Sequence, residues 1–377
     1  MKILFLTPGC FDKGGISRYS RYQIEALRQI FGSGNVKVLS LLGKNSDSFE
    51  EDFFVDWNAG GSSFYKKIRF VLKLFFETIF WSPDYIHVAH VNFSGVAYII
   101  SKFKNAKVIL NVYGLEVWSG FSFDAKLGLK KAFKIISDCH YTKNYLINER
   151  LREDKDISVI WDCVNLNHFS PAQSSALVIE KYKLPDPQKF KIILTLGRLS
   201  SYARHKGYEN LIITFSKLAQ LYNDIYLVVA GDGDFRQNLE QLVKEKGIKD
   251  KVVFTGSIDE ADLPDIYRCA YLFSLISDRG IGRGEGIPLT PLEAMACGVP
   301  IIVGNHDGSQ EAIIDNNGVV VDPLDLNSHL KLFKRLIEDN LYYLQLKANT
   351  LTVSEVYFSF GTFKEKNEKF YNSLVVA

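Results

Sequence analysis

The feature that most constrains the fold is an alternation, maintained along the whole chain, between short apolar runs and amphipathic stretches. Apolar runs of about 4–8 residues are typical of buried parallel strands, and longer amphipathic stretches are typical of helices that cover a sheet. The alternation therefore predicts an α/β fold built from βαβ units. Strands are expected at 2–7, 36–42, 85–91, 107–114, 157–162, 190–198, 225–233, 251–257, 270–276, 300–305 and 318–322.

The length of 377 residues favours two domains, because one hydrophobic core rarely organises so long a chain. The segment "NHFSPAQSS" (167–175) interrupts the alternation with polar residues and a proline, so we place the linker there. We expect doubly wound, Rossmann-like domains over 1–168 and 169–355, with the carboxyl ends of their strands facing a central cleft. A C-terminal helix over 356–377 is expected to cross back to the first domain, although its pattern alone is compatible with packing on either one.

Composition excludes several broad classes of protein. Hydrophobic residues make up 47% of the chain and charged residues 23%, which is typical of a globular protein rather than a disordered one. The net charge of +2 gives no reason to expect nucleic acid as a partner. The five cysteines are scattered and never spaced CxxC, so we expect reduced thiols in a cytoplasmic protein, with neither a disulfide framework nor a zinc site. The apolar run of "MKILFLTPG" is too short for a signal peptide, and we expect a first strand there instead.

The stretch "FYKKIRFVLKLFFETIFW" (64–81) differs from the other helical segments in its aromatic content and in four basic residues, Lys66, Lys67, Arg69 and Lys73. It contains no uncharged run of the roughly 18 residues that a membrane span needs. Two interpretations remain open. It is either a core helix of the first domain or a basic amphipathic surface that contacts anionic lipid at the inner face of a membrane.

The segment "GEGIPLTPLE" (284–293) places one glutamate on each side of a tightly specified turn. Thr290, Pro291 and Glu293 match a capping box, which predicts a helix whose N-cap is Thr290. Glu285 lies outside such a box, on a loop whose amide groups together with the helix start would attract an anion. Because a carboxylate repels phosphate, Glu285 suits hydroxyl groups. A ligand with both phosphates and hydroxyls, such as a nucleotide sugar, meets both requirements.

These residues also carry a resemblance to a known family. The segment "GEGIPLTPLEAMACGVPIIVGNHDGSQEAI", which begins at residue 284, resembles the E-x7-E segment of retaining GT-B glycosyltransferases of family four. Further segments occur in that family's order: "GGISRYS" (14–20), "YGLEVW" (113–118), "VNLNHFSP" (164–171), "LGRLSSYARHKG" (196–207), "VVAGDGDFRQNLE" (228–240) and "VVFTGSI" (252–258). Each segment alone is weakly specific, whereas the ordered set covers nearly the whole chain.

The resemblance implies a set of donor-binding residues in the second half of the chain. Glu285 would hold hydroxyls of the donor sugar, and Glu293 would hold the ribose hydroxyls in addition to its capping role. Backbone amides would face the sugar and the phosphates at Gly286, Ile287, Pro288, Leu289 and Thr290. The backbone of Ser257 and Ile258 would read the nucleobase without distinguishing uracil from guanine.

Arg198 and Lys206 match the family's cation pair that clamps the donor diphosphate. Without the resemblance, they could equally be two solvated surface cations. The loop "SSYARH" is somewhat long, so Arg204 or His205 could share or replace the role of Lys206.

Two segments of the first half are also implied in catalysis. Gly14 and Gly15 either permit a tight turn or let the backbone approach the diphosphate. Tyr113 stands where many relatives have a histidine beside the donor sugar. A phenol can donate a hydrogen bond there, but it is no base near neutral pH. Its role is therefore positional, or the acceptor geometry is shifted, or activity is impaired, or the ring merely packs under its loop.

The resemblance implies a hexosyltransferase in which Arg198, Lys206, Glu285 and Tyr113 are the catalytic residues. A hexose or N-acetylhexosamine would pass to a glycan or polyprenyl-linked acceptor by same-face displacement, as in bacterial surface polysaccharide or O-antigen assembly. No metal and no other cofactor is expected, and "DGD" (232–234) is assigned to a turn after a strand. Two rival functions are a nicotinamide-dependent oxidoreductase and a non-catalytic protein that binds sugar nucleotides.

Overall fold

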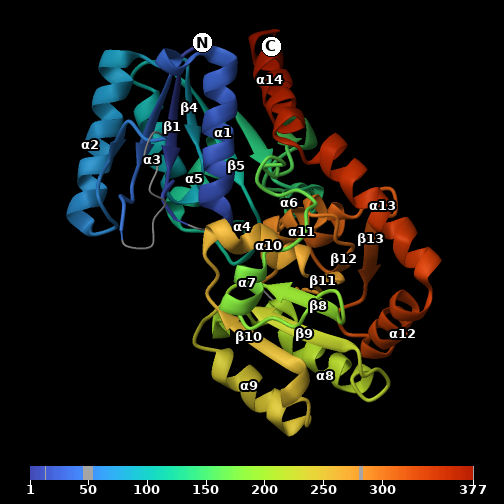
Figure 1. The fold of residues 1–377 in the computed structure, drawn as a ribbon. Helices are drawn as coiled ribbons and strands as arrows, with labels where there is room; N and C mark the ends of the chain where they lie inside the picture. The colour runs from blue at the N-terminus through green and yellow to red at the C-terminus, as the bar shows by residue number, and fades with distance from the viewer. Residues whose placement is uncertain (13, 46–53, 280–282, 377) are drawn as a thin grey trace. The chain divides into compact units, whose positions relative to one another are not determined.

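The contacts within the chain divide it into two compact units (Figure 1). The structure is a computed structural model that describes residues 1–12, 14–45, 54–279 and 283–376. Unit 1 comprises Met1–Cys163 and Phe360–Ala377, and unit 2 comprises Val164–Ser359. Unit 2 begins before the polar segment 167–175, because Val164 pairs with Ser359 and the buried ring of Phe169 packs on Tyr267.

Unit 1 is built on a parallel sheet with the strand order β3-β2-β1-β4-β5-β6-β7. This order reverses direction beside β1, as it does in doubly wound folds. The strands are β1 (Ile3–Thr7), β2 (Val36–Ser40), β3 (Trp57–Asn58), β4 (Tyr85–Val88), β5 (Lys107–Val112), β6 (Lys134–Ser137) and β7 (Ile157–Val159).

Helices cover both faces of the unit 1 sheet, as the alternating residues of β1 make clear. Ile3 and Phe5 lie in one apolar cluster with residues of α1 and α14, whereas Leu4 and Leu6 lie in another with residues of α2, α3 and α5. In Figure 1 the red helix α14 lies beside the blue helix α1. The helices are α1 (Gly15–Phe31), α2 (Phe64–Trp81), α3 (Ser94–Ser101), α4 (Leu115–Trp118), α5 (Phe123–Lys131), α6 (His140–Asn148) and α14 (Phe360–Val376).

Unit 2 has the same kind of parallel sheet, with the strand order β10-β9-β8-β11-β12-β13. Its strands are β8 (Lys191–Leu196), β9 (Ile225–Ala230), β10 (Val252–Gly256), β11 (Leu272–Leu275), β12 (Ile301–Gly304) and β13 (Gly318–Val321). Its helices are α7 (Ala176–Lys181), α8 (Tyr208–Leu218), α9 (Arg236–Glu245), α10 (Leu263–Arg268), α11 (Leu289–Ala296), α12 (Leu326–Glu338) and α13 (Asn340–Tyr357).

The predicted α/β class with parallel sheets is confirmed, and every expected strand is present. Two further strands, β3 and β6, were not expected from the sequence. β3 is only two residues long, and β6 has the short sequence "KIIS", which gives too little apolar pattern to distinguish a strand from a helix end. All five cysteines are buried thiols.

Candidate functional site

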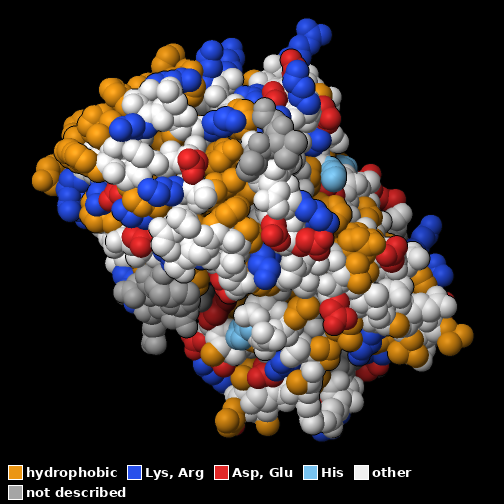
Figure 2. Space-filling model, turned by 90° about the horizontal axis from the view of Figure 1, so that it is seen from above, with side chains coloured by type: hydrophobic (Ala, Val, Ile, Leu, Met, Phe, Trp, Pro, Cys, Tyr) orange, Lys and Arg blue, Asp and Glu red, His pale blue; other side chains and the backbone are white. Residues whose placement is uncertain are grey.

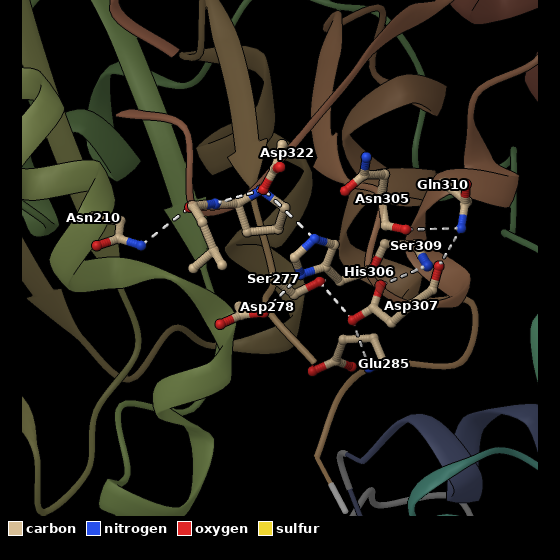
Figure 3. A network of polar contacts seen from close by, with 12 residues as sticks. Asn210, Ser277, Asp278, Glu285, Asn305, His306, Asp307, Ser309, Gln310 and Asp322 are labelled. Carbon is tan, nitrogen blue, oxygen red and sulfur yellow. Dashed lines mark hydrogen bonds and ion pairs between the residues drawn. The ribbon is translucent and has the colours of Figure 1, made fainter. Parts of the chain in front are cut away.

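A polar cluster lies at the carboxyl ends of three neighbouring strands of unit 2, namely β8, β11 and β12. The loop after β8 contributes Lys206, the residues after β11 contribute Ser277, and the residues after β12 contribute Asp307. The loop that begins at Arg283 adds Glu285 to this group (Figure 3). Ligands of open α/β sheets bind at the carboxyl ends of strands, so this edge is the candidate site.

Lys206 is brought to this edge by a short 3₁₀ turn, Ser201–Lys206, which ends at Gly207. Gly207 has a φ of 77°, and a Cβ atom there would lie 2.1 Å from the carbonyl oxygen of Ile276. Only glycine permits both this conformation and this approach. The backbone N–H of Asp278 also donates to the carbonyl of His205 at 2.7 Å, which fastens the turn to the end of β11.

Glu285 accepts hydrogen bonds from two side chains of this turn. Its Oε1 atom lies 2.6 Å from Lys206 Nζ and 2.9 Å from His205 Nε2. Burial disfavours the charged form of Glu285, but the positive charge of Lys206 and the contact with His205 outweigh it and bring the pKa to about 2. Glu285 is therefore a carboxylate near neutral pH, held beside an ammonium group.

The other cations of the loop differ in their partners. The Arg198 side chain is exposed and has no hydrogen bond or ion pair with any residue that the structure describes. The preceding residue, Gly197, lies against the aliphatic part of the Lys206 side chain. A Cβ atom added to Gly197 would lie 3.4 Å from Lys206 Cδ. Arg204 instead bonds Glu209 at 2.9 Å. Of the two alternatives to Lys206, His205 contacts Glu285 and Arg204 does not.

The "DGD" segment lies in a turn after β9, as the sequence predicts, and this turn packs on the Arg198 loop. Gly231 has a φ of 120°, and a Cβ atom there would lie 2.0 Å from the carbonyl oxygen of Gly197. Asp234 accepts hydrogen bonds from the backbone N–H of Ser201 at 2.9 Å and from its hydroxyl at 2.6 Å. Among the residues that the structure describes, no group of three or more His, Cys, Asp or Glu side chains could hold a metal ion.

The predicted capping box at Thr290 is wrong. Helix α11 begins at Leu289 and its N-cap is Pro288, with no side-chain cap, so Thr290 lies inside the first turn. The sequence pattern was misleading because the chain already enters the helix at Pro288 and Leu289, two residues earlier than predicted. Glu293 is buried, with 2% of its surface exposed, and its Oε2 atom accepts a hydrogen bond from the Tyr267 hydroxyl at 2.6 Å.

The remaining donor-binding residues of unit 2 differ in exposure. Gly286 and Thr290 are partly exposed, whereas Ile287, Pro288 and Leu289 are buried. Ser257 and Ile258 directly follow β10, which is the edge strand of the sheet. Ser257 is exposed and Ile258 is half-buried.

The paired glycines of unit 1 have no local structural reason to be glycine. Gly14 has a φ of −82° and is the N-cap of α1, and Gly15 is its first residue. A Cβ atom at either position would meet nothing within 4 Å among the described residues. A tight turn therefore does not require glycine at these positions, and the approach of a ligand to the backbone stays a prediction.

Tyr113 directly follows β5 and packs towards the interior of unit 1. Its ring meets that of Tyr19 edge-on at 5.2 Å, and its hydroxyl accepts a hydrogen bond from Asn111 Nδ2 at 3.1 Å. Burial raises the pKa of the phenol well above its usual value, so the hydroxyl stays protonated. These contacts match the interpretation in which the ring packs under its loop.

Two residues of the polar cluster were missed from the sequence. Asp307 and Ser277 are fully buried, and the Ser277 hydroxyl donates to Asp307 Oδ2 at 2.7 Å. Ser277 directly follows the expected strand 270–276, and Asp307 lies two residues after the expected strand 300–305. The rule that polar residues after parallel strands gather at one edge could have found them.

Comparison with known proteins identifies the part of the chain that contains this cluster. A family model described as "Glycosyl transferases group 1" matches residues 179–352. Residues 179–352 belong to the glycosyl transferases group 1 family. The match includes the turn with Lys206, the loop with Glu285, and Asp307.

Curated relatives match part of the chain. The mannosylfructose-phosphate synthase of Agrobacterium fabrum is 40% identical over 144 residues, which are 36% of this chain and 30% of that protein. The GDP-mannose-dependent alpha-(1-6)-phosphatidylinositol monomannoside mannosyltransferase of Mycolicibacterium smegmatis is 31% identical over 169 residues, 44% of this chain and 43% of that protein. The chain thus spans less than half the length of these two relatives.

Solved structures extend the likeness of fold to both units. Anabaena Alr3699/HepE in complex with UDP matches with a TM-score of 0.78 and 18% identity, over 99% of this chain and 100% of that one. The fold is therefore GT-B, with two Rossmann-like units, as the sequence predicts.

Proposed function

We propose that the protein is a retaining glycosyltransferase that moves a hexose or N-acetylhexosamine from a nucleotide diphosphate sugar to a glycan or lipid-linked acceptor. The observation that carries this proposal is the contact of Lys206 and His205 with Glu285 at the strand ends of the group 1 domain. The ammonium group suits a diphosphate, and the carboxylate suits sugar hydroxyls. Oε2 of Glu285 accepts no hydrogen bond from any described residue, so it is available to such a ligand.

The proposed chemistry is a same-face displacement. The bond between the anomeric carbon and the diphosphate oxygen breaks, the acceptor oxygen bonds to the anomeric carbon from the same side, and the departing phosphate takes the acceptor's proton. Arg198 and Lys206 would stabilise the charge that develops on the leaving diphosphate. Tyr113, whose hydroxyl stays protonated, would act by position and not as a base. No metal or other cofactor takes part in this scheme, so a chelator should leave turnover unchanged.

The nucleobase and sugar are the first properties to test. The mycobacterial relative is named for GDP-mannose, and the HepE structure holds UDP, so both bases belong in the panel. Thermal unfolding should be measured with UDP, GDP, UDP-glucose, UDP-N-acetylglucosamine and GDP-mannose. A ligand at about 100 times its dissociation constant stabilises the folded protein by about 2.7 kcal/mol. We expect one base and one sugar to stabilise the protein selectively.

Turnover then separates the enzyme from its rival. The purified protein should hydrolyse or transfer from the selected nucleotide sugar, and Glu285→Ala and Arg198→Ala should abolish this activity. Binding of the donor without turnover across candidate acceptors would instead favour the non-catalytic sugar-nucleotide-binding protein. Failure of every nucleotide to stabilise the chain would contradict both.

Helix α2 of unit 1 has an unusual surface, which bears on the acceptor. It buries only the stripe Phe70, Leu74 and Thr78 against its unit. Six large hydrophobic side chains of the same helix are at least 42% exposed, namely Phe64, Tyr65, Ile68, Leu72, Phe76 and Phe80. Neighbouring Phe103, whose ring meets Phe75 at 5.3 Å, is 60% exposed. Packing in the core explains the stripe but not this exposed face.

Basic side chains accompany the exposed face of α2. Lys66, Lys67, Arg69 and Lys73 lie on the same helix, and Lys66 Nζ is fixed by the carbonyl of Gly60 at 2.7 Å. Figure 2 shows orange hydrophobic and blue basic side chains together at its left edge, where α2 lies in Figure 1. None of the described helices is long and apolar enough to cross a membrane.

We propose that the α2 face lies on an anionic membrane surface, where the aromatic side chains enter the interface and the cations meet lipid phosphates. The acceptor would then be lipid-linked and lie at the cytoplasmic face of a bacterial membrane, as in surface polysaccharide or O-antigen assembly.

Vesicle sedimentation tests this surface. At low salt the protein should sediment with phosphatidylglycerol-containing vesicles and not with pure phosphatidylcholine vesicles. Phe76→Ser/Phe80→Ser, and separately a variant without the four basic residues, should each lose binding. Leu341→Ser, which removes a 75% exposed leucine from unit 2, should keep it. Dimerisation through α2 without vesicle binding would contradict the proposal.

A further inference from the structure

We infer that Asp307 is a positioning residue that holds the backbone of Glu285, and this inference rests on the proposed function. Asp307 Oδ2 accepts a hydrogen bond from the backbone N–H of Glu285 at 2.8 Å. In the opposite direction, the N–H of Gly308 donates to the carbonyl of Glu285 at 3.0 Å. Both backbone groups of Glu285 are thus tied to two consecutive residues of the loop after β12, Asp307 and Gly308. Figure 3 shows the contact between Glu285 and Asp307.

The contacts of Asp307 require a carboxylate. Besides Glu285, Asp307 Oδ2 accepts from the Ser277 hydroxyl at 2.7 Å, and Oδ1 accepts from the N–H of Ser309 at 3.0 Å. Donors therefore meet both oxygens of a side chain that has no measurable exposure. An asparagine would turn an NH₂ group towards one of these donors and lose that bond. Burying a carboxylate without a cation is costly and raises the pKa of Asp307, and the neutral donors offset part of this cost.

The anchor is rigid because it stands on two paired strands. Ser277 follows β11 and Asp307 follows β12, which are neighbours in the sheet. Gly304 lets the two strand ends approach closely, since a Cβ atom there would lie 2.3 Å from the carbonyl oxygen of Ser277. Through its hydrogen bond to the backbone of Glu285, Asp307 holds the loop at a fixed position relative to the strands. In this position the Glu285 side chain contacts Lys206 and His205. Site residues need support of this kind, since displacements of about 0.5 Å already impair function.

Hydrogen exchange followed by mass spectrometry tests the anchor without any ligand. In Asp307→Asn the backbone amides of 284–289 should exchange at least about tenfold faster than in the wild type, because a bond to a charged group is lost. Peptides from β8 and β9 should be unchanged. Asp322→Asn is the matched control, since Asp322 follows β13 in the same network and contacts the N–H of Leu324 and, at 3.5 Å, His306 Nε2, but not the Glu285 loop.

A kinetic measurement tests the consequence for the site. With UDP-glucose and GDP-mannose as probes, Asp307→Asn should lower kcat and raise KM for the donor, and Asp322→Asn should alter neither. Unchanged exchange of 284–289 in Asp307→Asn would overturn the inference. Faster exchange with no nucleotide binding even by the wild type would support the anchor and contradict the proposed function.

A second variant covers the case in which Asp307→Asn does not fold. Ser277→Ala removes one donor from Asp307 and leaves the carboxylate in place. It should accelerate exchange of the same loop by a smaller factor. An unchanged rate in this variant would overturn the inference equally.

Discussion

At the scale of single residues, Lys206 and Arg204 are two positions apart in one turn but have different partners. Lys206 bonds Glu285, whereas Arg204 bonds Glu209. Losing one group that stabilises charge in the transition state typically costs about 3 kcal/mol. Lys206→Ala should therefore lower turnover of the donor by about 10²-fold or more, and Arg204→Ala should change it by less than about twofold. Steady-state kinetics of the two variants measure this, and equal losses would argue against a specific role for Lys206.

Gly15 allows stability and activity to be separated. Its Cβ position is open and its conformation is helical, so alanine fits without strain. Because alanine is the better helix former, Gly15→Ala should raise the free energy of unfolding by about 0.5–1 kcal/mol. If the backbone approaches the donor here, the same variant should lose turnover. Denaturation and kinetics should be compared with Gly34→Ala, another open position. A Gly15→Ala enzyme of full activity would remove this loop from the site.

The pKa of Glu285 makes a prediction about pH. Burial raises the pKa of Glu285, but Lys206 and His205 lower it by a larger amount, so that it is about 2 in the folded protein. A glutamate in the unfolded chain titrates near about 4.3. The ionised side chain therefore stabilises the fold above the unfolded pKa, and this contribution is lost as the pH falls towards about 2. Glu285→Gln should be less stable by on the order of 3 kcal/mol between about pH 5 and pH 8. Denaturant titrations should show this difference shrinking below about pH 4, and a difference that grows in acid would contradict the assignment.

At this scale the sequence predicts which residues belong to the site, but not the direction in which their side chains point. It singled out Lys206 and Glu285, which the structure brings together, and it left His205 and Arg204 as equal alternatives. The structure distinguishes them, because the turn packs on β11 through the close approach of Gly207 to Ile276. In this turn His205 contacts Glu285, whereas Arg204 contacts Glu209. Asp307 and Ser277 could have been listed as polar residues that follow strands, but nothing in the sequence pattern shows that Asp307 contacts the Glu285 loop.

At the scale of secondary-structure elements, the critical contact is the close packing of Gly304, at the end of β12, against the backbone of Ser277 after β11. Gly304→Ala would place a Cβ atom 2.3 Å from Ser277 O and 2.9 Å from Pro323 Cγ. Overpacking of this kind typically costs about 1–3 kcal/mol, and we expect unit 2 to lose that amount together with affinity for the nucleotide. Denaturation and thermal shift with UDP and GDP measure both effects. Full stability would mean that the strand ends can separate without cost.

The elements themselves follow from sequence to different extents. Long apolar runs predict the buried strands of both sheets, because helices cover both faces and leave little alternation. The start of α11 was predicted two residues too late, because a capping pattern competes there with the geometry around Pro288. For 64–81 the pattern predicts a helix but cannot decide which residues are exposed, since that depends on the neighbours available to cover it.

At the scale of the whole molecule, the chain leaves unit 1 and returns to it. Helix α14 completes unit 1 through buried polar contacts with segments far away in sequence. Tyr371 donates to His87 Nδ1 at 2.5 Å, and Gln23 Nε2 donates to Asn367 Oδ1 at 3.0 Å. Because buried polar groups are costly when unpaired, these contacts specify where α14 docks. Each unit thus has its own core and its own buried polar contacts.

This organisation predicts that the two units can be destabilised separately. Asn367→Leu leaves Gln23 Nε2 buried without that partner and should lower the stability of unit 1 by about 1–3 kcal/mol. Asn317→Leu is the matched change in unit 2, where a fully buried asparagine accepts from the N–H of Ile314 at 2.8 Å. Calorimetry with and without the nucleotide that binds should show Asn317→Leu lowering the transition that the nucleotide raises, and Asn367→Leu lowering the other. If both variants lower one shared transition equally, the units unfold together and the prediction is wrong.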